Sequence, residues 1–95
     1  MVATPEYGVW GYIYNRDGTQ AVGELITVTC SCGGAGAEWE SEPSGDDGYW
    51  ETPFTSGEAD AHDGHHMNAF DKHLGDGKAF TFQKPATGPV VIRCT

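Results

Sequence analysis

The sequence predicts an all-β fold: a Greek-key β-sandwich of about seven strands, formed as a single domain over residues 1–95. Three observations predict it. Within short segments, apolar residues recur at every second position. The 14 glycines and 5 prolines separate these segments as turns would. A chain of 95 residues is also short enough to close only one hydrophobic core.

Residues 7–14 form the first predicted strand, because small or aliphatic side chains alternate there with aromatic ones. Residues 15–18 (Asn-Arg-Asp-Gly) predict a turn, since Gly accepts positive φ and Asn and Asp bond the local backbone. A second strand is predicted at residues 25–30, where β-branched residues place Ile26, Val28 and Cys30 on one face.

The remaining strands are predicted from similar alternation, at residues 37–42, 49–52, 78–83 and 90–94, with a turn at 85–89. Between them, residues 55–77 break the rhythm and predict a long insertion. Met67, Phe70 and Leu74 recur there at i, i+3 and i+7, so either one short helix or an ordered loop pinned by these side chains fits.

Four sequence segments carry a resemblance to a known family: residues 9–13 (VWGYI), 17–18 (DG), 22–23 (VG) and 47–50 (DGYW). The pattern resembles the transthyretin-like (prealbumin-like) sandwich of carboxypeptidase regulatory-like and collagen-adhesin B-type domains. The resemblance implies a seven-strand sandwich that serves adhesion, display or assembly without catalytic residues. The first strand has no Lys for an adhesin-type isopeptide bond, so that bond is not expected.

The charge of the chain limits its partners. Fourteen acidic residues against five basic ones give a formal net charge of -9. This charge excludes nucleic acid as a partner and disfavours anionic membranes, because both interactions depend on Lys and Arg. No apolar run approaches the roughly 20 residues needed to span a bilayer.

The histidine-rich segment is the strongest candidate for a metal site, with Zn²⁺ or Cu²⁺ as the ion. On a helix His62 and His66 would stand one turn apart, and His73 would lie two turns further on. The alternative is a solvated polar insertion. The predicted metal ligands are His62, His65, His66 and His73.

Three cysteines, Cys30, Cys32 and Cys94, allow one disulfide and a remaining thiol, or three thiols. Cys30 and Cys94 each share a predicted strand face with inward residues, so a disulfide between them is predicted, with two buried thiols as the alternative. The Cys-Ser-Cys segment lacks the two-residue spacer of a zinc knuckle.

The aromatic residues exceed what one small core needs, so some are predicted to form a partner surface for a carbohydrate, a neighbouring copy or a larger particle. The alternative is that they only cover the outer sheet. The residues in question are Trp10, Tyr12, Tyr14, Trp39 and Trp50.

Together these features predict a non-catalytic structural or interaction module that self-assembles or decorates a virion or surface appendage. Its partners would be copies of itself or another protein. A small metal-binding protein and a carbohydrate-binding module are the alternatives. No nucleophile signature surrounds any Ser or Cys, so no enzymatic activity is expected. An extracellular or virion-surface location is favoured, although residues 1–6 have no secretion signal: either one was removed or none exists.

Overall fold

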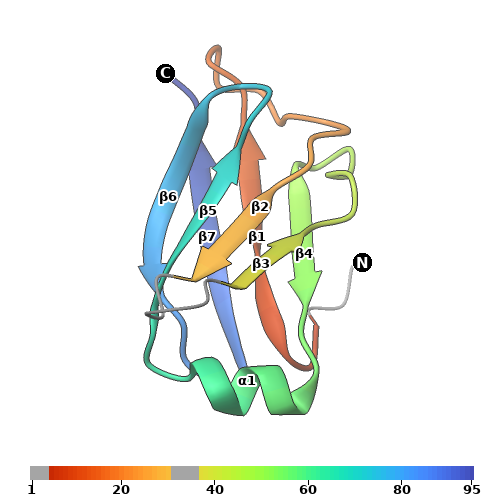
Figure 1. Ribbon diagram of the computed structural model, residues 1–95. Helices are drawn as coiled ribbons and strands as arrows, with labels where there is room; N and C mark the ends of the chain where they lie inside the picture. Colours follow the sequence, from red (N-terminus) through yellow and green to blue (C-terminus); the bar gives the residue numbers. More distant parts are fainter. Residues whose placement is uncertain (1–4, 31–36) are drawn as a thin grey trace.

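The computed structural model describes residues 5–30 and 37–95, in which seven strands form two sheets and one short helix closes an end (Figure 1). The predicted all-β sandwich is confirmed. The elements are β1 (Gly8–Tyr14), β2 (Thr27–Cys30), β3 (Ala37–Glu40), β4 (Tyr49–Pro53), α1 (Ser56–His62), β5 (His66–Asp71), β6 (Asp76–Thr81) and β7 (Ala86–Arg93).

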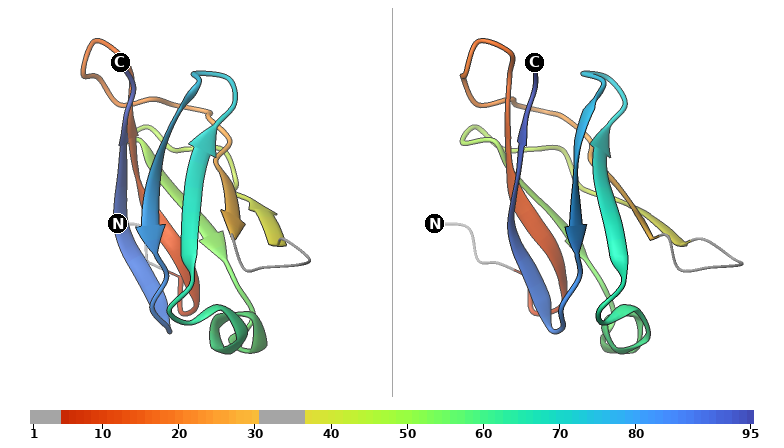
Figure 2. Two further views of the ribbon diagram at one scale, coloured as in Figure 1. Left: turned by 60° about the vertical axis from the view of Figure 1, so that its left-hand side comes forward. Right: turned by 90° about the vertical axis from the view of Figure 1, so that its left-hand side faces the viewer.

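The two sheets face each other as layers (Figure 2). One has the strand order β4-β1-β7, and the other has the order β3-β2-β5-β6. Strand β1 pairs antiparallel with β4 but parallel with β7. The sandwich therefore brings the first and last strands of the described chain side by side.

The core fills the space between the layers, and the alternation of each strand determines which side chains enter it. Strand β1 has the burial pattern predicted from its sequence, with Val9 and Ile13 fully buried and the aromatic side chains between them half-buried. Trp50 and Phe82 are the largest fully buried side chains.

The segment predicted as an insertion is part of the sandwich itself. Helix α1 occupies its first part, and β5 is a central strand of the four-stranded sheet. The expected helical grouping of Met67, Phe70 and Leu74 is wrong, since Met67 points into the core from β5 whereas Phe70 points outward and is 41% exposed.

The last strand is longer than predicted. Strand β7 begins at Ala86, so residues 86–89 belong to a strand and not to the expected turn. Its first residues pair with the start of β1, where Gly8 lies opposite Ala86. Within the described residues, no helix is long and apolar enough to cross a membrane.

Candidate metal centre

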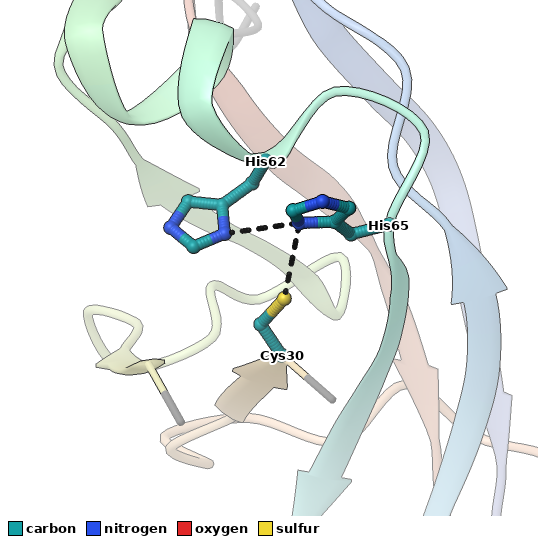
Figure 3. Close-up of side chains that lie close together, drawn as sticks. All are labelled: Cys30, His62 and His65. Atoms are coloured by element: carbon teal, nitrogen blue, oxygen red, sulfur yellow. Dashed lines mark hydrogen bonds between the residues drawn. The ribbon is translucent and has the colours of Figure 1, made fainter. Parts of the chain in front are cut away.

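The candidate site lies at the helix end of the sandwich, where three segments converge (Figure 3). Cys30 is the last residue of β2, His62 is the last residue of α1, and His65 lies just before β5. One ligand atom from each of the three side chains lies within 4.8 Å of the other two. In the described part of the chain, these three residues are the group whose geometry can hold a metal ion.

The helix that carries His62 begins with a capping box. Thr55 accepts a hydrogen bond from the Glu58 backbone N–H, and the Glu58 carboxylate accepts one from the Thr55 N–H. Ala59 is 1% exposed and anchors the helix on the core. These contacts place the C-terminal end of α1 next to Cys30, where β2 ends.

His65 is held by its backbone. Its N–H donates to the carbonyl of His62, and its own carbonyl accepts from the N–H of Phe82. Gly64 has φ 82° between the two histidines, a conformation that Gly adopts without strain. The turn from α1 into β5 therefore holds both histidines at the helix end of the sandwich.

Trp39 packs beside the site and connects it to the helix cap. Its ring lies edge-on to the His62 ring, with centroids 5.1 Å apart. Its indole N–H donates to the Glu58 carboxylate over 2.9 Å. Hydrogen bonds from the Thr55 backbone and from Trp39 lower the pKa of Glu58, so the carboxylate stays charged close to His62.

Two of the three separations between ligand atoms match those around a tetrahedral ion. His62 Nδ1 and His65 Nδ1 are 3.4 Å apart, and His65 Nδ1 is 3.7 Å from Cys30 Sγ. Zn–N and Zn–S bonds of about 2.0 and 2.3 Å at tetrahedral angles separate ligands by about 3.3 Å (N to N) and about 3.6 Å (S to N). These two separations therefore need little adjustment to accept such an ion, and the third ligand pair also lies within 4.8 Å.

Cys30 is buried, at 5% exposure, and its sulfur is disulfide-bonded. Cys94 is a free, buried thiol, so the predicted disulfide between Cys30 and Cys94 is wrong. Cys30 ends β2 in one sheet, whereas Cys94 directly follows β7 of the other sheet. Cys32 lies outside the described residues.

The structure separates the four histidines predicted as ligands. His62 and His65 come together, but His66 starts β5 on its outer side, where its ring contacts the Thr81 hydroxyl. The expected helical pair of His62 and His66 is wrong, because α1 ends at His62. Cys30 was not predicted as a ligand, although its place at the end of an inward-facing strand was a usable signal.

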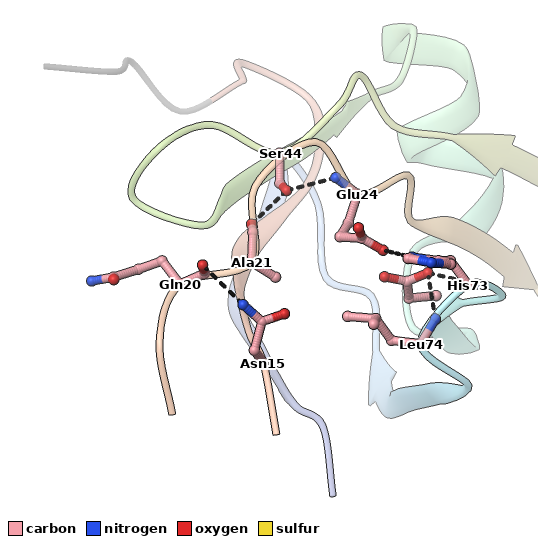
Figure 4. A network of polar contacts seen from close by, with 8 residues as sticks. Asn15, Gln20, Ala21, Glu24, Ser44, His73 and Leu74 are labelled. Atoms are coloured by element: carbon pink, nitrogen blue, oxygen red, sulfur yellow. Dashed lines mark hydrogen bonds and ion pairs between the residues drawn. The ribbon is translucent and has the colours of Figure 1, made fainter. Parts of the chain in front are cut away.

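His73 lies at the opposite end of the sandwich, in the turn after β5, and takes part in a different polar cluster (Figure 4). Its ring contacts the Glu24 carboxylate over 2.8 Å. This hydrogen bond raises the pKa of His73. Asp71 lies beside this pair at 1% exposure, and desolvation together with Glu24 raises the pKa of its carboxyl group.

The five aromatic residues predicted as a partner surface divide into two groups. Trp50 is 1% exposed and Trp39 packs on the core, so the prediction for Trp50 is wrong and Trp39 belongs with the metal centre. Trp10 and Tyr12 lie half-buried on the outer face of β1, and Tyr14 is covered by the Arg93 guanidinium, 4.9 Å from its ring centre.

Comparisons of the chain with protein-family models, with curated protein sequences and with solved structures find no match. The transthyretin-like resemblance remains a prediction from the sequence. The case for function therefore depends on the geometry of the sites themselves.

Proposed function

We propose that this domain is a non-catalytic module that binds one transition-metal ion through Cys30, His62 and His65. The observation that carries the proposal is the convergence of one sulfur and two imidazole nitrogens within 4.8 Å of one another, with two of the separations close to those around a tetrahedral ion. The donor set favours Zn²⁺ or copper, because thiolate and imidazole are the ligands that these ions prefer.

The surroundings also favour a cation. The chain has a formal charge of -9, and three carboxylates belong to the helix and turn that carry the ligands: Glu58, Asp60 and Asp63. Asp60 forms an exposed ion pair with Lys84, and Asp63 accepts a hydrogen bond from the Lys84 backbone. The negative field attracts divalent ions, and the ligand set provides the selectivity.

A metal titration of the reduced protein tests this function. Co²⁺ is the probe, since a tetrahedral thiolate complex absorbs strongly in the near ultraviolet and visible. We expect one Co²⁺ per chain, displaced by Zn²⁺. The variant Cys30→Ser should lose the thiolate absorption, and His62→Gln should lose the tetrahedral spectrum.

The matched controls are His66→Gln and His73→Gln, which remove the same side chain outside the cluster. Both should bind Co²⁺ as the wild type does. Circular dichroism of every variant checks that the fold is kept. Equal loss of Co²⁺ binding in His62→Gln and His66→Gln, or no Co²⁺ binding by the wild type, would reject the proposed site.

A second candidate function is self-assembly or partner binding through the outer face of β1, and a specific cluster favours it. Trp10, Tyr12 and Tyr49 form a network of rings, with centroids 5.7 to 6.3 Å apart. A Cβ at Gly88 would lie 2.4 Å from the Trp10 ring, so the indole rests directly on the β7 backbone. Rigid, half-exposed aromatic residues are typical of binding surfaces.

Native mass spectrometry before and after EDTA separates the two functions. A defined oligomer that survives EDTA and is lost in Trp10→Ala would support assembly. A monomer that carries one metal ion would support the metal centre alone. Tryptophan fluorescence of Trp39→Phe protein, in which Trp10 and the buried Trp50 remain, tests the carbohydrate alternative: a change on adding glycans that is lost in Trp10→Phe would favour it, and an unchanged signal would argue against it.

A further inference from the structure

We infer that the redox state of Cys30 controls metal binding at this centre; this inference depends on the proposed metal-binding function. The same sulfur that completes the ligand triangle is disulfide-bonded. A metal–thiolate bond requires the deprotonated thiol, which a disulfide sulfur cannot supply. The two states of Cys30 therefore exclude each other at the site.

The rest of the centre is built without the disulfide. His62 is positioned by α1, through the capping box and through Ala59 in the core. His65 is positioned by its backbone hydrogen bonds to His62 and Phe82. Reduction of Cys30 therefore leaves both imidazoles in place and adds the third ligand to a prepared pair.

The chemistry balances with a thiol reductant. A dithiol, or two molecules of a low-molecular-weight thiol, supplies two electrons and two protons, which split the disulfide into two thiols while the reductant becomes a disulfide. The Cys30 thiol then loses its proton to solvent as the metal ion binds. Oxidation runs the steps in reverse and releases the ion.

The contacts of His65 differ between the two states of Cys30. His65 Nδ1 approaches both Cys30 Sγ and His62 Nδ1. A disulfide sulfur has no proton to donate, and one imidazole nitrogen carries at most one proton, so this nitrogen cannot donate a full hydrogen bond to each neighbour. In the reduced state, a metal ion at the centre of the triangle would bond to all three ligand atoms at once.

The test is a Co²⁺ titration of two preparations of the same protein, one oxidised with diamide and one reduced with a phosphine. We expect the reduced form to bind one Co²⁺ and the oxidised form to bind it at least about 100-fold more weakly, because a direct ligand is lost. Thiol counting by mass spectrometry after alkylation verifies the redox state. Cys94→Ser, which removes a buried free thiol elsewhere, should keep the full difference.

The reciprocal measurement is protection of Cys30. Bound Zn²⁺ should slow both alkylation of Cys30 and its reoxidation, and Cys30→Ser should bind Co²⁺ equally in the presence of either reagent. If oxidised and reduced protein bind equally, redox control is wrong and Cys30 is not a ligand, while metal binding by His62 and His65 is retained. If neither form binds, the proposed function itself is wrong.

Discussion

His73 shows how a single contact sets the behaviour of a side chain in this protein. Its ring is largely exposed, yet its hydrogen bond to Glu24 raises its pKa above the ordinary 6.5. Because the folded-state pKa is raised, the contact contributes stability at pH values below the unfolded pKa, and this contribution is lost as pH rises through the folded pKa.

The variant Glu24→Gln tests this contact. It removes the carboxylate that favours the imidazolium, so the pKa of His73 should fall back toward its ordinary value. The measurement is an NMR titration of the imidazole carbon-bound protons in wild type and variant. A pKa of His73 that is the same in both proteins would contradict the assignment.

The pKa of Asp71 is raised, whereas the pKa of an ion-paired acid is lowered. Asp71 is 1% exposed, and its Oδ1 accepts hydrogen bonds from the His73 and Leu74 backbone N–H groups. Its raised folded pKa means that stability is lost as pH rises from the ordinary value of 3.8 through the folded value. Glu24 behaves in the opposite way: although burial alone would raise its pKa, hydrogen bonds with Asp71 and His73 lower it.

Asp71→Asn is therefore expected to be as stable as the wild type at pH 7, or more stable. The amide keeps the acceptor oxygen for the two backbone N–H groups and offers Glu24 a permanent donor. Urea unfolding at pH 3.5 and pH 7 checks this, with the advantage of the variant growing toward pH 7. A variant less stable than the wild type at pH 7 would show that the carboxylate itself is required.

At the level of secondary structure, the close pairing of β1 and β7 depends on Gly11. A Cβ added there would lie 1.8 Å from the Val90 carbonyl oxygen, next to the register shift between Val9 and Gly11. Gly11→Ala should lower the free energy of unfolding by about 1–3 kcal/mol, the usual range for overpacking, as measured by urea unfolding.

Gly57→Ala is the matched control, since this glycine lies in the first turn of α1 and an added Cβ would meet nothing closer than 3.9 Å. It should raise stability by roughly 0.4–1 kcal/mol, because Ala has less backbone freedom to lose on folding. If both variants change stability equally, the close approach at Gly11 is not the cause.

Glu58 connects helix α1 to strand β3, because its two carboxylate oxygens accept hydrogen bonds from Thr55 N–H and from the Trp39 indole. In Glu58→Gln the amide keeps only one acceptor oxygen, so we expect a loss of about 1 kcal/mol at pH 7. The folded pKa is lowered, so the wild-type contribution is present above the ordinary value of 4.5 and is lost as pH falls through the folded value.

Thermal unfolding at pH 7 and pH 3 measures both effects. The two proteins should differ at pH 7 and converge in acid. Glu42→Gln, which changes the same charge on an exposed loop, should match the wild type throughout. A difference between Glu58→Gln and wild type that persists at pH 3 would assign the effect to packing and not to the carboxylate.

The elements differ in how well the sequence predicts them. Strand β1 is predicted well because its outer aromatic and inner aliphatic residues follow the strand period. Strand β5 was missed because Phe70 faces outward and Asp71 faces inward, which hides its alternation. The sequence predicts the candidate metal centre only in part, since the meeting of Cys30 with His62 and His65 depends on how α1 closes the sandwich.

For the whole molecule, metal binding and folding are linked if the proposed centre is occupied. The ligands come from β2, from α1 and from the turn just before β5, so the ion would join segments that separate on unfolding. At a metal concentration 100 times the Kd, the reduced protein should gain about 2.7 kcal/mol. For a domain of this size the Tm then rises by roughly 10–20 °C.

Differential scanning calorimetry of reduced protein with Zn²⁺ and with EDTA measures this shift. Cys30→Ser should show a smaller shift, while His66→Gln should show the wild-type shift because its ring lies outside the cluster. A Tm that does not depend on Zn²⁺ in the wild type would contradict a metal bound by the folded state.

The parallel pairing of β1 with β7 has a mechanical consequence. The two strands run in the same direction, side by side, so the start of β1 and the end of β7 lie at opposite ends of their shared ladder (Figure 1). A force that pulls these two points apart acts along the strands and loads all of their hydrogen bonds in shear together, instead of opening them one by one. Breaking this pair by pulling at these two points should therefore need more force than peeling the same strands apart from one end.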